Sequence, residues 1–173
     1  SQGVSCSFGS ASGLTQTGYT FKGGWGTSAS CTATTTSFTT PGSSTYYACK
    51  SAKTYTITLD DNNGSGGSGT AKEVYATKWT NSSGTTITSV TVPTRTGYTF
   101  KGYYTSASGG TQRITAAGAL PSNTTFTSNT TLYAQWTPNI YKVTLDNQGA
   151  TSAGTTAYWY EFNTQDPCYY YSD

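Results

Sequence analysis

The sequence predicts a mainly β protein, and its composition is the first reason. Aromatic residues make up 14% of the 173 residues and include 15 Tyr, whereas charged residues make up only 9%. Aromatic and β-branched side chains suit a half-buried pleated surface. Because disordered chains are poor in aromatic residues, we expect ordered β structure with polar outer faces.

Alternation along the chain is the second reason. Residues 55–60 (Tyr-Thr-Ile-Thr-Leu-Asp) place an aromatic or aliphatic side chain at every second position, which is the pattern of a half-buried strand. Turn-forming residues follow as far as Gly64, and strand character returns at residues 73–79. We expect these two segments to form a hairpin with a flexible tip at residues 66–69.

Two more strands are expected at residues 98–104 and 130–137. They follow Pro93, which cannot donate a hydrogen bond inside a central strand. Residues 114–120 contain three Ala, a good helix former, so one or two helical turns are expected there despite Gly118. The core of this part is expected to contain Ile57, Leu59, Val74, Tyr98, Phe100, Leu132, Tyr133 or its neighbour, and Trp136.

An internal repeat is the third reason, and it also sets the domain organisation. Three blocks recur in the same order: residues 18–23 at 97–102, residues 44–50 at 130–136, and residues 55–60 at 141–146. We therefore expect one complete module at residues 54–139. Residues 1–53 are expected to be the back part of a module, and residues 140–173 the front part of another.

The repeated blocks resemble the Listeria–Bacteroides repeat, the B-repeat of internalin-type bacterial surface proteins. Residues 55–60 with the following turn, residues 93–104 and residues 130–136 carry the resemblance. It covers residues 54–139 and, more loosely, both flanking pieces. It implies tandem small β-grasp-like modules with little helix, on secreted or surface proteins of bacteria. Such modules act as spacers, stalks or adhesive elements rather than as enzymes.

The first flanking piece departs from the repeat pattern at several positions. In the alignment by sequence, Gly24 replaces the first aromatic residue of the Tyr103-Tyr104 pair, and Trp25 keeps the second. Lys50 replaces Trp136. We expect these departures to leave the fold of the central module unchanged.

The composition excludes several kinds of chemistry. The sequence has no His, so imidazole ligands and Ser-His or Cys-His catalysis are absent. Its nine Lys and Arg are scattered singly, which gives no basic face for nucleic acid, and no window of about 18 apolar residues is present to span a membrane. Asp60 and Asp61 are interpreted as turn-capping residues, with a weak Ca²⁺ site as the alternative. We therefore assign no catalytic, cofactor-binding or metal-binding residues and expect no enzyme activity.

The four cysteines are too widely spaced for a four-cysteine zinc site, and they indicate disulfides formed in an oxidising compartment. Four cysteines allow three connectivities, and the sequence alone does not choose among them. Because Cys31 and Cys49 lie in the two segments of residues 1–53 expected to be closest together, we predict a Cys31–Cys49 bond, with Cys6 paired to Cys168. We expect an extracellular or cell-surface location.

Aromatic side chains are the candidates for contact with a ligand, and a glycan is the candidate ligand. Tyr169, Tyr170 and Tyr171 are the set most expected to be exposed, because a strand places at least one of them on its outer face. The full candidate set is Trp79, Tyr103, Tyr104, Trp136, Trp159 and Tyr169 to Tyr171. A small aromatic core is the simpler interpretation for most of these residues.

These observations favour a non-catalytic structural repeat, a stalk or filament; the alternative is an adhesive module that binds host or surface glycan or protein. Because the sequence begins with Ser1 and contains no Met, we expect a processed chain or a piece of a longer one. The two partial pieces together match the length of one module, and half a module would expose strand edges. We therefore expect residues 140–173 to complete a copy of residues 1–53. The partner is a neighbouring copy joined head to tail or an adjacent repeat of an array, both favoured over one chain closed on itself.

Overall fold

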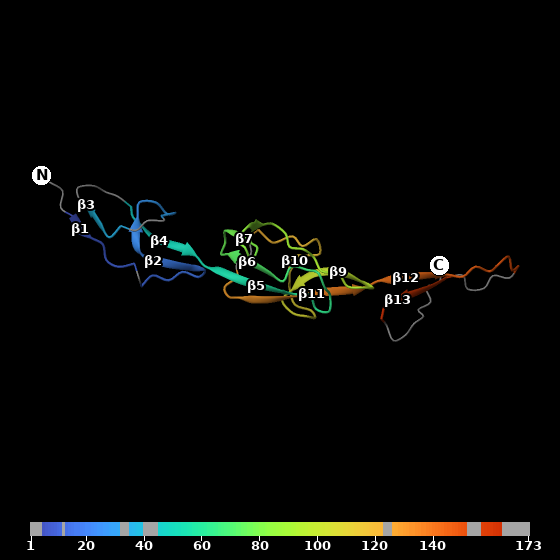
Figure 1. The fold of residues 1–173 in the computed structure, drawn as a ribbon. Helices are drawn as coiled ribbons and strands as arrows, with labels where there is room; N and C mark the ends of the chain where they lie inside the picture. Colours follow the sequence, from blue (N-terminus) through green and yellow to red (C-terminus); the bar gives the residue numbers. More distant parts are fainter. Residues whose placement is uncertain are drawn as a thin grey trace. The chain divides into compact units, whose positions relative to one another are not determined.

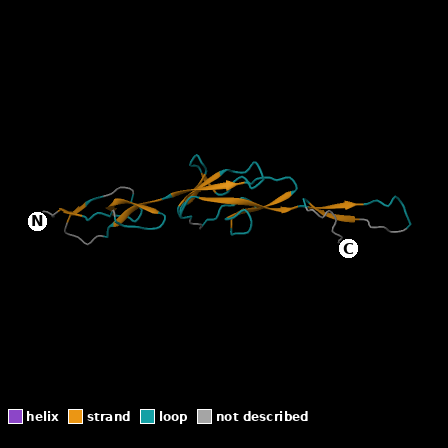
Figure 2. Ribbon diagram, turned by 90° about the horizontal axis from the view of Figure 1, so that it is seen from below, coloured by secondary structure: helices purple, strands orange, loops and turns teal. Residues whose placement is uncertain are grey.

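The computed structural model describes residues 5–11, 13–31, 35–39, 45–122, 126–151 and 157–163. Within these ranges the chain forms thirteen strands and no helix (Figure 2). The prediction of a mainly β fold is therefore confirmed. In the part of the chain so described, no helix has the length and apolar character needed to cross a bilayer.

Two small antiparallel sheets lie in the amino-terminal part of the chain (Figure 1). Strand β1 (Ser5–Ser7) pairs with β3 (Ser37–Thr39), and β2 (Tyr19–Gly26) pairs with β4 (Tyr47–Ala52). The β2–β4 register shifts between Phe21 and Trp25, where β2 carries extra residues opposite β4.

A seven-stranded sheet occupies the middle of the sequence. In spatial order its strands are β10 (Gln112–Thr115), β9 (Tyr98–Tyr104), β11 (Thr130–Pro138), β5 (Thr54–Asp60), β6 (Thr70–Val74), β7 (Lys78–Thr80) and β8 (Thr86–Ile87). Strands β5, β9 and β11 are the three strands predicted from alternation and from the repeat. Strand β6 lies beside β5, as the predicted hairpin requires.

The last two strands, β12 (Ile140–Thr144) and β13 (Ala157–Glu161), form an antiparallel pair of their own. At two places in the chain, one strand is followed by the next after a single intervening residue. Lys53 separates β4 from β5, and Asn139 separates β11 from β12. The same strand-to-strand connection therefore occurs twice in the chain.

The chain divides into two compact units. The first comprises Ser1–Ile57, Thr70–Ile87 and Ser122–Thr130, and the second comprises Thr58–Gly69, Thr88–Pro121 and Thr131–Asp173. The buried side chains of the first unit are Ala11, Cys49, Ile57, Ala71, Glu73, Trp79, Thr80 and Phe126. Those of the second unit are Leu59, Val90, Pro93, Tyr103, Ile114, Leu132 and Ala134.

Three local predictions were wrong. Residues 114–120 form no helical turn, because Ile114 and Thr115 belong to β10 and pair with β9, and Gly118 takes a φ of +77° that an α-helix excludes. Residues 73–79 are not one strand, since the chain turns between β6 and β7 at Ala76, with φ +50°. The tip at residues 66–69 is held in place, because the Ser68 backbone N–H donates to the Thr91 carbonyl over 3.0 Å.

The predicted core is confirmed only in part. Ile57, Leu59 and Leu132 are buried, and so is Ala134, the neighbour of Tyr133. Val74, Tyr98, Phe100, Tyr133 and Trp136 are half-buried instead. A module this small encloses few side chains completely, so its larger rings keep one edge at the surface.

Candidate functional site

A glycine meets an aromatic ring where β4 leads into β5. Gly18 has φ +77°, and a β-carbon at this position would overlap the ring of Tyr75. Tyr75 also packs edge to face on Tyr19, with ring centroids 5.4 Å apart. The Lys53 backbone N–H donates to the Gly18 carbonyl over 2.8 Å, and the Tyr75 N–H donates to the Lys53 carbonyl over 2.9 Å. We call this set the first junction.

The second unit contains the same arrangement where β11 leads into β12. Gly97 has φ +77°, and its missing β-carbon would overlap the ring of Phe162, which packs edge to face on Tyr98 at 5.4 Å. The Asn139 N–H donates to the Gly97 carbonyl over 2.8 Å, and the Phe162 N–H donates to the Asn139 carbonyl over 2.9 Å. This second junction keeps every bond of the first although two of its side chains differ.

The turn after β5 is locked onto β11. Asn62 and Asn63 adopt positive φ values of 45° and 68°, and the Asp60 carboxylate accepts a hydrogen bond from the Asn62 backbone N–H over 2.8 Å. The Asn62 side chain donates to the Ala134 carbonyl over 2.8 Å. The Trp136 indole N–H donates to the Asn62 carbonyl over 3.0 Å. The predicted capping role of these residues is therefore confirmed, and the turn also joins the two strands.

Tyr103 is a fully buried tyrosine in the second unit. Its hydroxyl donates to Asp61 Oδ1 over 2.9 Å, and the Gly67 backbone N–H donates to Asp61 Oδ2 over 3.2 Å. Burial, followed by the hydrogen bond and the negative charges of Asp61 and Asp60, raises the pKa of Tyr103 well above its ordinary value. Tyr103 is thus a core residue and not part of an exposed aromatic platform.

The turn after β12 has the same geometry as the turn after β5. Gln148 and Gly149 have φ values of 51° and 80°. The Asp146 carboxylate accepts from the Gln148 N–H over 2.8 Å, and the Ala150 N–H donates to the Asn147 carbonyl over 3.0 Å. The second hairpin therefore has the turn that follows β5 in the complete module.

The apolar side chains of β12 and its extension are exposed. Val143 and Leu145 match Ile57 and Leu59 of the repeat, and they are 49% and 43% exposed where their counterparts are 0% and 5% exposed. The sequence already shows this match, because residues 55–60 recur at residues 141–146. The front hairpin at the end of the chain consequently presents an uncovered apolar face.

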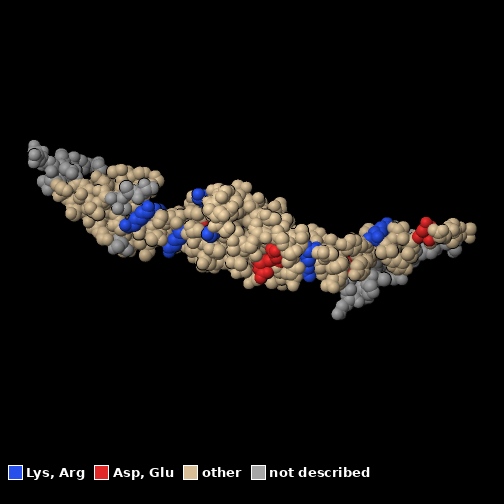
Figure 3. Space-filling model, viewed as in Figure 1, with Lys and Arg blue, Asp and Glu red and all other residues tan. Residues whose placement is uncertain are grey.

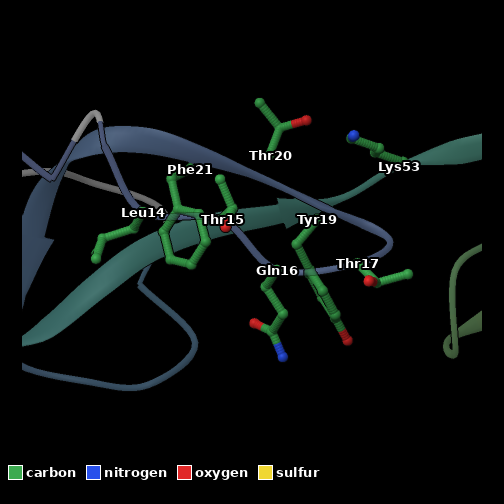
Figure 4. Close-up of a pocket in the computed structure, with 8 residues that line it drawn as sticks. All are labelled: Leu14, Thr15, Gln16, Thr17, Tyr19, Thr20, Phe21 and Lys53. Carbon is green, nitrogen blue, oxygen red and sulfur yellow. The ribbon is translucent and has the colours of Figure 1, made fainter.

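Residues 1–53 form a groove at the position where the complete module packs Pro93 beside Gly67. The groove has a volume of about 670 Å³ and is lined by Leu14, Thr15, Gln16, Thr17, Tyr19, Thr20, Phe21 and Lys53 (Figure 4). Leu14 is 44% exposed. Its counterpart in the repeat, Pro93, is fully buried, and a β-carbon placed on Gly67 would lie 3.1 Å from the Pro93 side chain.

Strand register corrects one part of the sequence alignment. Trp25 pairs with Ala48, and Tyr103 pairs with Ala134. Trp25 therefore takes the place of Tyr103, the first aromatic residue of its pair, and not that of Tyr104. The extra residue in the first copy lies between Phe21 and Trp25, at the register shift.

Cys31 and Cys49 are joined by a disulfide, with their Cα atoms 5.4 Å apart. Gln135 stands in the second copy where Cys49 stands in the first, and its side chain donates to the carbonyls of Ser106 (2.9 Å) and Gly109 (2.5 Å). An amide side chain thus ties down the loop after β9, whereas a covalent bond ties down the loop after β2.

The other two cysteines do not complete a second bond in the described structure. Cys6 is half-buried on β1 and has no disulfide partner among the described residues. Cys168 lies outside those residues. The pairing of Cys6 with Cys168 stays a prediction.

The aromatic ligand candidates are only partly placed. Trp159 is half-buried on β13, with the Lys142 ammonium 5.4 Å from its ring centroid. Tyr169, Tyr170 and Tyr171 lie outside the described residues. Trp79 is buried and packs edge to face on Phe126, 5.9 Å away, and so contributes to the core.

Charged groups do not gather into a site in the described part of the chain. No three His, Cys, Asp or Glu residues are placed there to hold one metal ion. Lys, Arg, Asp and Glu form scattered patches on the face that Figure 3 shows. One carboxylate is buried: Glu73 Oε2 accepts a hydrogen bond from the Phe126 backbone N–H over 2.7 Å.

The strands, turns and junctions define a β-structured repeat module. The family model of the Listeria-Bacteroides repeat domain matches residues 55–135. Internalin H of Listeria monocytogenes serovar 1/2a is 38% identical over 68 residues, which cover 39% of this chain and 12% of that protein. No solved structure matches the chain. The resemblance seen in the sequence is therefore confirmed over residues 55–135.

Proposed function

We propose that the chain is a non-catalytic structural repeat of an extracellular bacterial surface or fibre protein, part of a stalk or filament. Tandem β-grasp-like modules with boundaries near residues 53 and 139 are part of this proposal. The observation that carries it is the duplicated junction. A repeat that keeps two backbone hydrogen bonds, a positive-φ glycine and an aromatic pair at successive boundaries is suited to hold its neighbours at a fixed orientation.

The junction supports a spacer because it leaves little freedom to the connecting residue. At the second junction, both backbone groups of Asn139 are hydrogen-bonded, the N–H to Gly97 and the carbonyl to Phe162. A flexible linker would instead have solvated backbone groups and several connecting residues.

The proposed assembly is head to tail, by completion of the two partial modules. Its partner is a neighbouring copy of the chain or an adjacent repeat, and neither nucleic acid nor a membrane span is involved. The exposed Val143 and Leu145 at one end and the exposed Leu14 at the other support this assembly. Each of them stands where the complete repeat has a buried residue.

The spacer role can be tested by spin-label distances across the second junction. Labels on cysteines introduced at the exposed positions Thr99 and Thr144, with Cys6 and Cys168 changed to Ser, report the distance between β9 and β12. We expect one narrow distance distribution, which Gly97→Val broadens. A broad distribution in the chain with Gly97 intact would contradict the spacer role.

An adhesive module is the second candidate function. The half-buried Trp159 beside Lys142 favours it, because an aromatic face with a polar group at its edge suits a sugar ring. A glycan array with the unchanged chain, Trp159→Ala and Tyr170→Ala tests it. Binding lost in either variant would support adhesion, and no binding above background by the unchanged chain would exclude a glycan ligand.

A further inference from the structure

We propose that the groove beside Leu14 receives the front hairpin of a second copy of this chain, with a defined residue register. This inference rests on the proposed head-to-tail assembly and specifies its contacts. The occupant is the turn at residues 146–149, together with the apolar face formed by Val143 and Leu145. The complete repeat shows how such a hairpin is seated.

The first contact in the register is a pair of backbone hydrogen bonds. In the second unit, Ser65 and Thr94 each donate a backbone N–H to the other's carbonyl over 2.9 Å. Their counterparts in the repeat are Thr151, after the second turn, and Thr15, on the wall of the groove. Both threonines are exposed. Both residues lie outside the strands of this structure, and a docked hairpin would bring them together as the same pair of backbone hydrogen bonds.

The second contact replaces an indole donor with an ammonium donor. Lys50 pairs with Phe21 as Trp136 pairs with Phe100, so Lys50 occupies the tryptophan position. Trp136 donates to the carbonyl of Asn62, whose counterpart is Gln148. The Lys50 ammonium has three N–H donors, one of which is given to Gln16 Oε1 at 2.6 Å. The remaining donors of the ammonium, which lies 4.1 Å from the centroid of the Tyr19 ring, would donate to the Gln148 carbonyl of a docked hairpin.

The third contact replaces a phenol donor with an indole donor. Tyr103 donates to the Asp61 carboxylate, and Trp25 stands in its place in the first copy. Asn147 is the counterpart of Asp61, and its amide oxygen is an acceptor without a charge. The Trp25 indole N–H, which now donates to Gly9 O over 2.9 Å, would turn toward this acceptor. The altered residues on the two pieces remain complementary.

The hairpin is ordered before it binds. The 2.8 Å hydrogen bond at Asp146 and the positive φ of Gln148 already give the turn the geometry of the seated one. Preorganisation of this kind lowers the conformational entropy lost on association. A rigid apolar hairpin opposite a groove of matching register favours a folded copy over an unstructured peptide as the occupant.

A second copy is a better occupant than the same chain. The groove and the hairpin are separated in sequence by the whole of residues 54–139, and the only connecting residues are Lys53 and Asn139. Both are held by backbone hydrogen bonds at the junctions, so neither provides a flexible linker for a fold-back. Association between chains does not need such a linker.

Sedimentation velocity of the full chain over a range of concentrations tests the interaction. We expect species that grow with concentration, and Leu145→Asp to raise the dissociation constant about tenfold or more because a charge would enter the apolar contact. Thr144→Asp is the matched control, since Thr144 is the neighbouring exposed residue and its counterpart Thr58 is exposed in the complete repeat. A chain that stays monomeric throughout, or equal loss in both variants, would overturn the proposal.

Disulfide cross-linking tests the register. With Cys6 and Cys168 changed to Ser, a Thr15→Cys chain mixed with a Thr151→Cys chain should give a mixed dimer on mild oxidation. A Ser7→Cys chain mixed with the same partner is the control for random collision, because Ser7 is exposed on β1 and does not line the groove. Equal yields in the two mixtures would overturn the register, and a link formed mainly within a Thr15→Cys/Thr151→Cys chain would overturn the second-copy occupant. The spin-label distances at the junction do not depend on either result, so failure of the spacer role is distinguished from failure of the docking.

Discussion

The ring of Phe162 fills the space that a β-carbon on Gly97 would need. The relationship between these two residues repeats the relationship between Tyr75 and Gly18, so the aromatic side chain differs while the glycine is the same. Tyr and Phe are both tolerated because each presents a flat ring to the glycine. A β-carbon at the glycine would overlap that ring. The junction thus requires a residue without a β-carbon at this position.

Gly97→Ala should destabilise the chain by about 2–4 kcal/mol, the sum of a left-handed backbone cost and of overpacking against Phe162. Gly84→Ala is the matched control, because Gly84 has φ +85° but open space around it. That variant should lose only about 1 kcal/mol. Chemical denaturation followed by tryptophan fluorescence compares them, and equal losses would show that the ring contact contributes nothing.

The two loop ties should differ in strength. Replacing both Cys31 and Cys49 with Ser should cost about 3 kcal/mol, since the bond closes a loop of 18 residues in the unfolded chain. Gln135→Ala should cost about 1 kcal/mol, the net value of an ordinary hydrogen bond. Calorimetry measures both, with Thr27→Ala as the control expected to change little, because Thr27 is exposed next to the same loop. A larger loss from Gln135→Ala than from the cysteine pair would contradict this order.

Tyr103 should make stability fall at alkaline pH. Its pKa is raised in the folded state, so the folded chain keeps a proton that an unfolded tyrosine releases near pH 10. The resulting stabilisation is complete below about pH 10 and is lost as the pH rises above that value. The free energy of unfolding should be measured for the unchanged chain and for Tyr103→Phe from about pH 8 to about pH 12, a range that spans the ordinary tyrosine pKa. We expect it to fall less steeply with pH in the variant. Tyr103→Phe should also cost about 2 kcal/mol at neutral pH, through the lost hydrogen bond to Asp61.

Residues 54–139 should fold as an independent fragment. They include the whole seven-stranded sheet and the locked turn at Asn62. We expect one cooperative thermal transition that coincides in circular dichroism and fluorescence. A non-cooperative or absent transition would show that the module boundaries lie elsewhere.

Much of the fold was predictable because the repeat and the alternation are local signals. Strand β9 has the bounds that the Gly-Tyr-Thr-Phe block predicted. The helical turn expected at residues 114–120 was wrong because strand pairing with Tyr103 overrode the preference of alanine for helix. Propensity describes an isolated segment, whereas this pairing depends on β9, whose Tyr103 lies eleven residues before Ile114.

The candidate site was less predictable than the fold. The exposure of Leu14 becomes informative only when its counterpart Pro93 is found buried beside Gly67. The match of Trp25 to Tyr103 depends on an inserted residue that sequence alignment placed at the wrong position. Neither fact could be read without strand register. The match of Leu145 to Leu59 was visible in the repeated sequence. It marks Leu145 as a residue that the complete module buries.

The Cys31–Cys49 bond has a mechanical consequence for a chain placed under tension. A pulling force acting on the two ends of the polypeptide would pass across the bond and leave the segment it encloses unloaded. With 18 residues of separation, about 60 Å of contour length would stay hidden until the bond is reduced. The second copy, whose corresponding loop is held by hydrogen bonds from Gln135 and Asn62, would release that loop as soon as its strands part. Two repeats with the same strands would therefore lengthen by different amounts under load.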